Sequence, residues 1–306
     1  MSPRIAARWE EVWDLLPKAM KGEDPEAVHA ARVASRRLRA AMDGAAEAFP
    51  KPWYRSLHKS AKHITRTLGH VRDQDVLLEK LVADRERAAA AERLGIDRLI
   101  ERITSERDDA RSAMLTTLRR SRVRRMRKAS RTRFPVGRDK AARRRVRKRN
   151  DGTTPPKRAQ RQIEERSADL LRYEPIIPDA NAVEELHDAR IAVKRLRYTL
   201  ELFEQGIGDE AARLIQDTKG LQEVLGNLHD LDVSIEIVTG ELDAQRTVTD
   251  LDPRLVASLE SIVRRDQGTR QETHRAVVES WEALMADGFR ERLDRVAAKR
   301  DPERVA

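Results

Sequence analysis

VHAARVASRRLR at residues 28–39 and LHDARIAVKRLR at residues 186–197 are two copies of one pattern, 158 residues apart. A second pair follows at an offset of 157 residues, with LGHVRDQDV at 68–76 and LGNLHDLDV at 225–233. Because the two offsets agree within one residue, the repeat indicates that a whole unit is duplicated. The apolar residues of the first pair recur every three or four positions, which is typical of an amphipathic helix. The sequence therefore predicts an all-α protein with two related helical units.

Turn-forming residues predict where the units and their helices begin and end. The stretch NDGTTPP at 150–156 indicates a linker, so we expect a first unit over 1–150, a linker over 151–157 and a second unit over 158–306. The helices expected in the first unit span about 25–49, 53–82 and 96–133, with a short basic helix over 138–149. Those expected in the second span about 158–172, 182–205, 209–246 (whole or broken), 253–286 and 288–299. Short loops between long amphipathic helices favour antiparallel bundles.

The composition excludes several classes of protein. The 306 residues contain no cysteine, which excludes disulfide bonds and thiolate metal sites. No run approaches the ~20 apolar residues that a membrane helix needs. At the N-terminus, acids and tryptophans stand where a signal peptide would have an apolar core. We therefore expect a soluble cytoplasmic protein.

The positive charge is concentrated in one stretch of the chain. The net charge is +10, but residues 121–161 hold 18 lysines and arginines and only two acids, Asp139 and Asp151. The rest of the chain carries 44 basic and 50 acidic residues, so it is slightly acidic. The Arg-rich residues 119–149 are called the basic segment below. We expect this segment either to be a solvated charge run or to contact a polyanion.

Helical projection places a set of cations beside the apolar stripe of each repeated helix. At about 100° per residue, four side chains of the second unit share an arc of about 80°. They are His187, Arg190, Lys194 and Arg197. The equivalent residues of the first unit are His29, Arg32, Arg36 and Arg39. These two edges are called the basic faces below, and Arg37 and Arg195 project away from them.

The basic faces are unusual for a helix surface, because no acid stands among their cations. Like charges three or four residues apart repel by a few tenths of a kcal/mol each, so we expect an external anion to offset the repulsion. Arginine forks match phosphate oxygens, lysine adds a point charge, and protonated histidine donates to phosphate. The faces therefore predict a site for a long phosphate polyanion. The alternative is that acids on neighbouring helices pair with these cations, and the candidates are Asp73, Asp75, Asp230 and Asp232.

The second repeated motif reads R-D-x-D-V in one unit and H-D-x-D-V in the other, and it indicates a junction between helices. Gly69 and Gly226 permit close packing or a bend there. Asp73 and Asp230 are expected either to cap a helix or to orient an arginine of the first helix. Further candidate ligands of the anion come from the helix that carries this motif. They are Lys62, Arg72, Lys219 and His229.

Together these motifs resemble the CHAD family, the conserved histidine α-helical domain. The resemblance rests on H-x-x-R-[VI]-x-x-[KR]-[RK]-L-R followed by L-G-x-x-[RH]-D-x-D-V, with the pair repeated, and it extends from about residue 5 to 300. It implies two pseudo-twofold-related antiparallel four-helix bundles with a basic central groove that binds inorganic polyphosphate, often at polyphosphate granules. The eight residues of the basic faces match that groove, and Lys62, Arg72, Lys219 and His229 match it less directly. The ExExK motif of triphosphate-tunnel domains does not occur, so the chain resembles a stand-alone member without that catalytic activity.

Other functions leave weaker marks in the sequence. His187-Asp188 and His229-Asp230 resemble the dipeptides of HD-type metal phosphohydrolases, but the first unit has no His-Asp dipeptide. P-loop, HExxH and nucleophile-elbow motifs do not occur, so we expect no enzyme, no cofactor and no metal. The alternative function is nucleic-acid binding through the basic segment, although aromatic residues for base stacking are scarce. A third possible function is that of a scaffold, which would bind partners through the polar helices 96–133 and 253–286.

Overall fold

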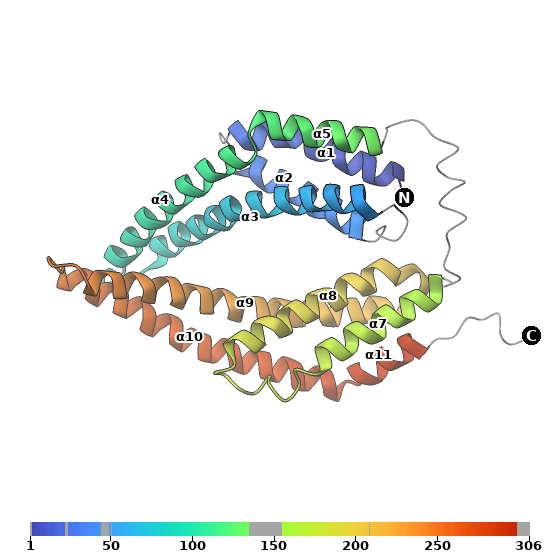
Figure 1. Cartoon of the computed structure of the whole chain (residues 1–306). Helices are drawn as coiled ribbons and strands as arrows, with labels where there is room; N and C mark the ends of the chain where they lie inside the picture. The colour runs from blue at the N-terminus through green and yellow to red at the C-terminus, as the bar shows by residue number, and fades with distance from the viewer. Residues whose placement is uncertain are drawn as a thin grey trace, which may run out of the picture. The chain divides into compact units, whose positions relative to one another are not determined.

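The computed structural model describes residues 2–21, 24–43, 49, 51–134, 155–207 and 209–298, and all regular structure within them is helical (Figure 1). The all-α fold expected from the sequence is therefore confirmed. The chain divides into two compact units, Met1–Asn150 and Asp151–Ala306. No described helix is both long enough and apolar enough to cross a membrane.

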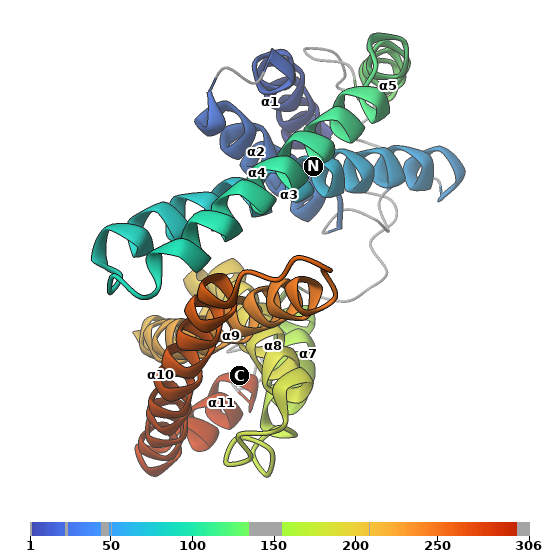
Figure 2. The ribbon, with the colours of Figure 1, turned by 90° about the vertical axis from the view of Figure 1, so that its left-hand side faces the viewer.

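The first unit is built around a long antiparallel hairpin. Its described helices are α1 (Ser2–Lys21), α2 (Pro25–Asp43), α3 (Lys51–Arg87), α4 (Arg93–Thr117) and α5 (Arg120–Arg133). Helix α2 packs against both α1 and α3, and α3 pairs with α4 in the hairpin (Figure 2). Helix α5 follows α4 after a bend and lies against α1 and α3. The helix with the first basic face is thus held between two neighbours.

The second unit has the same pattern of helix contacts. Its described helices are α7 (Pro155–Leu171), α8 (Val183–Ile207), α9 (Asp209–Arg246), α10 (Pro253–Ala286) and α11 (Phe289–Ala298). Helix α8, which carries the second basic face, packs against α7 and α9, and α9 forms a hairpin with α10. The short α11 closes the unit against α7, α9 and α10.

The apolar stripes predicted for the two repeated helices form the centres of the two cores. On α8, the side chains of Leu186, Ala189, Val193, Leu196 and Leu200 are all buried. On α2, buried apolar residues recur at the same three- and four-residue spacing from Val28 to Met42. Because this stripe is fixed against the core, the cations beside it are held at the edge of the helix, where solvent can reach them.

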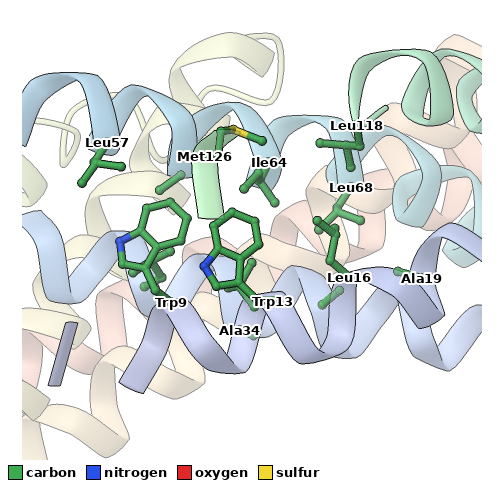
Figure 3. Packing of buried hydrophobic residues seen from close by; sticks show 14 of the residues in the cluster. Trp9, Trp13, Leu16, Ala19, Ala34, Leu57, Ile64, Leu68, Leu118 and Met126 are labelled. Atoms are coloured by element: carbon green, nitrogen blue, oxygen red, sulfur yellow. The ribbon is translucent and has the colours of Figure 1, made fainter. Parts of the chain in front are cut away.

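Aromatic packing closes the core of the first unit. Trp9 and Trp13 lie one turn apart on α1, and their rings stack with centroids 5.0 Å apart. Figure 3 shows the two indoles side by side, with Ile64 of α3 and Met126 of α5 packed above them. The indole Nε1 of Trp13 donates to the hydroxyl of Ser130 on α5, 3.1 Å away. These contacts hold α5 on the body of the unit.

Each unit has five described helices, one more than the four-helix bundles that the resemblance implied. In the first unit, the single helix expected over 96–133 is broken after Thr117. Leu118 is buried, and Arg119 is extended with φ −49° and ψ 145°. Neither glycine nor proline marks this break. The turn lets Met126 and Phe134 reach the core, so burial of apolar side chains overrides local helix propensity.

Other helix boundaries lie close to those expected from the sequence, except at the linker. Gly288, with φ +76°, separates α10 from α11, and glycine adopts this left-handed conformation without strain. Helix α9 runs unbroken from Asp209 to Arg246. The end of the expected linker, residues 155–157, instead forms the first turn of α7, where proline is tolerated because the first turn needs no donor. The expected basic helix 138–149 and the linker residues before Pro155 lie outside the described residues.

Candidate functional site

The predicted ligands lie on two adjoining helices in each unit. In the first unit, α2 carries His29, Arg32, Arg36 and Arg39, and α3 carries Lys62 and Arg72. In the second unit, α8 carries His187, Arg190, Lys194 and Arg197, and α9 carries Lys219 and His229. Arg36, Lys62 and Lys219 are exposed, and the other nine side chains are half-buried. Each unit therefore presents its six predicted ligands from one pair of packed helices.

Arg32 is held by the glycine motif of the neighbouring helix. Its guanidinium lies 2.5 Å from the carboxylate of Asp73 and donates to the carbonyl oxygen of Gly69 at 3.4 Å. A Cβ on Gly69 would lie 3.8 Å from Arg32 Cζ, and one on Gly226 would lie 3.9 Å from Arg190 Nε. The two glycines therefore lie directly against the arginines of the basic faces. A methyl group would fit there, but a larger side chain would displace the guanidinium.

The two aspartates of the repeated motif have different roles. Asp73 and Asp230 lie in the middle of continuous helices, so the expected helix junction and N-caps are absent. Asp73 instead orients Arg32, which was the other expectation. The second aspartates tie the hairpins together, since Asp75 binds Arg107 of α4 and Asp232 binds Arg270 of α10. Of the four expected acids, Asp73 thus pairs with a cation of the basic faces, which is Arg32.

His187 and His229 form a direct pair in the second unit. Their Nδ1 atoms lie 3.0 Å apart and their ring centroids 4.3 Å apart. One nitrogen must donate and the other must accept, so the pair holds this geometry only while at least one Nδ1 is unprotonated. Burial lowers the pKa of His229, and the nearby His187 and Arg190 lower it further. His229 is therefore neutral near pH 7.

Arg72 occupies the place of His229 in the first unit, and its surroundings differ. Its guanidinium binds Glu79 through two nitrogens, at 2.8 and 3.4 Å. This ion pair raises the pKa of Arg72 and lowers that of Glu79. Arg72 is consequently engaged within its own helix. An external anion must displace Glu79 to bind it, which weakens Arg72 as a candidate ligand.

An open pocket of about 1220 Å³ lies beside the histidine pair, between α8, α9 and α10. Besides the two histidines and Arg270, its lining includes five carboxylates, and these are Glu184, Asp188, Asp232, Glu236 and Asp243. Carboxylates repel phosphate, so this pocket is unsuited to a polyanion. The candidate anion site is the neighbouring edge of α8 with Arg190, Lys194 and Arg197. The histidine pair lies between this pocket and that edge of α8.

Three predicted ligands have unused hydrogen-bonding capacity within the described part of the chain. The Nε atoms of Arg39, Arg72 and Arg197 are shielded from solvent and have no hydrogen-bond acceptor there. Arg197 Nε lies 3.3 Å from the carboxylate of Glu201 in an ion pair without hydrogen-bond geometry. Unmet donors of this kind cost free energy. The Nε atoms of these arginines are thus left with unused donors inside the protein.

Comparison with known proteins identifies the family. The sequence profile of the CHAD domain matches residues 4–239. The chain belongs to the CHAD domain family. A crystal structure of the CHAD domain from the plant Ricinus communis has the same fold, with a TM-score of 0.63 and 22% sequence identity over 92% of this chain and 90% of that one. No curated protein matched the chain.

The structure of this CHAD chain also shows ion-pair partners of two predicted ligands that were not expected from the sequence. Glu79 and Glu201, the partners of Arg72 and Arg197, stand on the same helices seven and four residues downstream. The i,i+4 spacing of Arg197 and Glu201 is typical of an ion pair along a helix, so it could have been recognised in the sequence. Arg37 points to Glu11 of α1 at 3.8 Å, which confirms that it leaves the basic face. Within the described residues, no group of three or more His, Cys, Asp or Glu side chains is arranged to hold a metal ion.

The histidine pair predicts that the stability of the CHAD chain depends on pH. Because the pKa of His229 is lowered below its ordinary 6.5 in the folded state, the unfolded state binds protons more readily. The stabilising contribution of neutral His229 is present above about pH 6.5, and it is lost as the pH falls through the pKa of His229 in the folded state. We expect the melting temperature to fall between pH 7 and 5, and to fall less in His229→Gln. Thermal unfolding followed by circular dichroism measures this, with His70→Gln, at an exposed histidine, as the control. Equal pH slopes in the two variants would contradict the assignment.

Proposed function

We propose that this CHAD protein binds inorganic polyphosphate through its two basic faces and does not catalyse a reaction on it. The observation that carries the proposal is the repeated edge of α2 and α8. In each unit the same four positions place a histidine and three cations beside the core, next to a lysine-bearing neighbour helix. Membership of the CHAD family supports the same conclusion. The groove that the resemblance implied stays a prediction.

The chemistry of the faces favours phosphate over other anions. Guanidinium groups bind two phosphate oxygens at once, and lysine adds a point charge that tolerates many geometries. The ion pair of Arg32 with Asp73 does not block this, because the Asp73 side chain is 66% exposed and such pairs contribute little. A histidine among cations, such as His187, is better suited to holding a phosphate than to attacking one. We therefore propose binding without turnover.

Binding to polyphosphate also gives the protein a proposed location. A protein that holds a long polyanion through several weak contacts stays with it wherever the polymer accumulates. We propose a cytoplasmic protein that associates with polyphosphate granules. The sequence alternative, nucleic-acid binding through the basic segment, concerns a different surface, because the described part of that segment is α5 together with Arg119 and Phe134.

A displacement experiment tests the proposal. Labelled polyphosphate of ~100 units is bound to the protein at physiological salt and challenged with unlabelled polyphosphate or with duplex DNA at equal phosphate concentration. We expect polyphosphate to displace the label and DNA to displace little of it. Binding should weaken steeply with salt, because each phosphate contact releases a counterion. If DNA displaces the label as well as polyphosphate does, the faces bind any polyanion and the proposal is wrong.

A further inference from the structure

Helix α5 is a second concentration of positive charge, separate from the basic face of α2. Its fourteen residues, RSRVRRMRKASRTR, contain eight arginines or lysines and no acid. Met126 and Ser130 are buried, and Val123 packs against the same core. These three positions fix the inner side of the helix. The cations are therefore spread over the outer side.

Seven of the eight cations of α5 form two rows. At about 100° per residue, Arg120, Arg124, Lys128 and Arg131 fall within an arc of about 80°. Arg131 pairs with Glu10, so this row borders α1. Arg122, Arg125 and Arg133 form the other row. The Arg133 guanidinium stacks on the Trp53 ring at 5.3 Å, so this row borders α3.

Positive charge continues from the second row onto α3. Lys59 and Arg66 are exposed there, and His63 lies between them and α5. Burial lowers the pKa of His63, and the positive charges of Arg122 and Arg66 lower it further. Arg122 of α5 and Arg66 of α3 thus both lie close enough to His63 to affect its charge. We call a group of exposed cations drawn from both helices the α5 patch, and its members are Lys59, Arg66, Arg120, Arg122, Arg124, Arg125 and Lys128.

The α5 patch has little internal compensation. Within the part of the chain that the structure describes, Glu10 is the one carboxylate paired with a cation of α5, and it binds Arg131 outside the patch. Neighbours such as Arg120 and Arg124, or Arg124 and Lys128, stand four residues apart and repel. The repulsion is tolerated on a helix whose inner side is held by the core. An external polyanion would offset it.

We propose that the α5 patch binds duplex nucleic acid through its phosphate backbone, without regard to sequence. The helix is about 21 Å long, enough to follow about six phosphates of one strand. Its cations recur about every 6 Å along a row, which matches every second phosphate. No asparagine or glutamine stands on α5 to read base edges. Ser121 adds a hydroxyl donor to phosphate on the same exposed side.

Three other occupants fit the α5 patch less well. A membrane-surface helix needs exposed large apolar residues, and the exposed apolar residue of α5 is Ala129 alone. Single strands need aromatic rings for stacking, and the nearby Trp53 is half-buried under Arg133. Free polyphosphate is flexible, so it loses chain entropy when it is laid along a convex ridge. A duplex presents phosphates that are already held in place.

Paired charge-removal variants test this inference. In the α5 variant, four exposed cations become alanine, and they are Arg120, Arg124, Arg125 and Lys128. The control variant removes the same charge from exposed arginines elsewhere, at Arg37, Arg195, Arg264 and Arg275. Both are titrated with a 30-base-pair duplex of mixed sequence. The α5 variant should lose at least tenfold in affinity, and its log–log salt slope should shrink by about 3 to 4. The control variant should stay within about threefold of the wild type.

The same variants separate this inference from polyphosphate binding at the basic faces. Polyphosphate affinity should change by less than about threefold in the α5 variant. If it falls in parallel with DNA affinity, the patch belongs to one general polyanion site and the inference is wrong. The inference is also wrong if DNA binding is unchanged, or if only binding to vesicles with anionic lipid is lost. Because alanine favours helix, the α5 variant should keep its helical content. If it does not, Arg124→Glu combined with Lys128→Glu is a second variant with the same expected outcome.

Discussion

Replacing the central cations of both basic faces by alanine is expected to abolish polyphosphate binding while the helices remain intact. The four substituted residues are Arg32, Arg36, Arg190 and Lys194. Each charge-assisted hydrogen bond contributes about 1.5 to 3 kcal/mol, so the loss of four should weaken binding by far more than ~100-fold. The positions lie at the edge of α2 and α8 and not in the core, so circular dichroism should be unchanged. Isothermal titration with polyphosphate measures the effect.

The chain provides a closely matched control for this experiment. Arg37 and Arg195 are the sequence neighbours of Arg36 and Lys194, but they project away from the faces. The double variant Arg36→Ala with Lys194→Ala should weaken polyphosphate binding by at least tenfold. Arg37→Ala with Arg195→Ala removes the same charge from the same helices and should have a small effect. Equal losses in the two double variants would mean that net charge, and not the face, controls binding.

Removing Arg107 is expected to destabilise the first unit by about 3–5 kcal/mol. Arg107 of α4 binds Asp75 of α3 at 2.5 Å, and the Asp75 side chain is only 3% exposed. Without its partner the carboxylate would stay charged in a poorly solvated place, which is the large cost of a broken buried pair. Urea unfolding followed by tryptophan fluorescence measures the change. Three of the four tryptophans lie in the first unit, so the signal comes mainly from there.

Two further variants show whether the burial of Asp75 causes the loss of stability. Arg85 and Asp97 also join α3 to α4, but both side chains are more than 40% exposed. Arg85→Ala should therefore leave the urea midpoint nearly unchanged. The double replacement Asp75→Leu with Arg107→Met removes both charges and should recover most of the stability, because a packed apolar pair can replace a buried ion pair. If Arg107→Ala is as mild as Arg85→Ala, the buried pair is not what holds the hairpin.

The repeated helices were predictable because their periodicity is a local property. Val28, Leu38, Leu186 and Leu196 are buried as the three- and four-residue spacing required, and the cations between them fall on the adjoining edge. The same projection separated Arg37 from Arg36. The break expected between helices 253–286 and 288–299 is also real, and Gly288 takes a left-handed conformation there without strain. Each of these features follows from a few residues along one helix.

Other features depend on residues far apart in the sequence. The break between α4 and α5 has no turn-forming residue, and it exists because Phe134 and Met126 bury against α1 and α3. Asp73 was a candidate helix cap until the helix proved continuous, and only the packing of α2 on α3 gives it Arg32 as a partner. The pairing of Asp75 with Arg107 joins residues 32 positions apart. Such partners are set by helix packing, which local spacing does not encode.

The sequence by itself determined that this chain is helical, that it repeats, and that each repeat carries a histidine and three cations on one helix edge. Those properties follow from the period of the α-helix and the chemistry of the side chains. Tertiary structure alone decided how the two copies of the second motif differ. Arg72 reaches Glu79 on its own helix, whereas the shorter His229 meets His187 across α8 and α9, beside an open pocket. Side-chain length follows from the residue type, but the distance between the packed helices decides what each side chain reaches, and that distance cannot be read from the sequence.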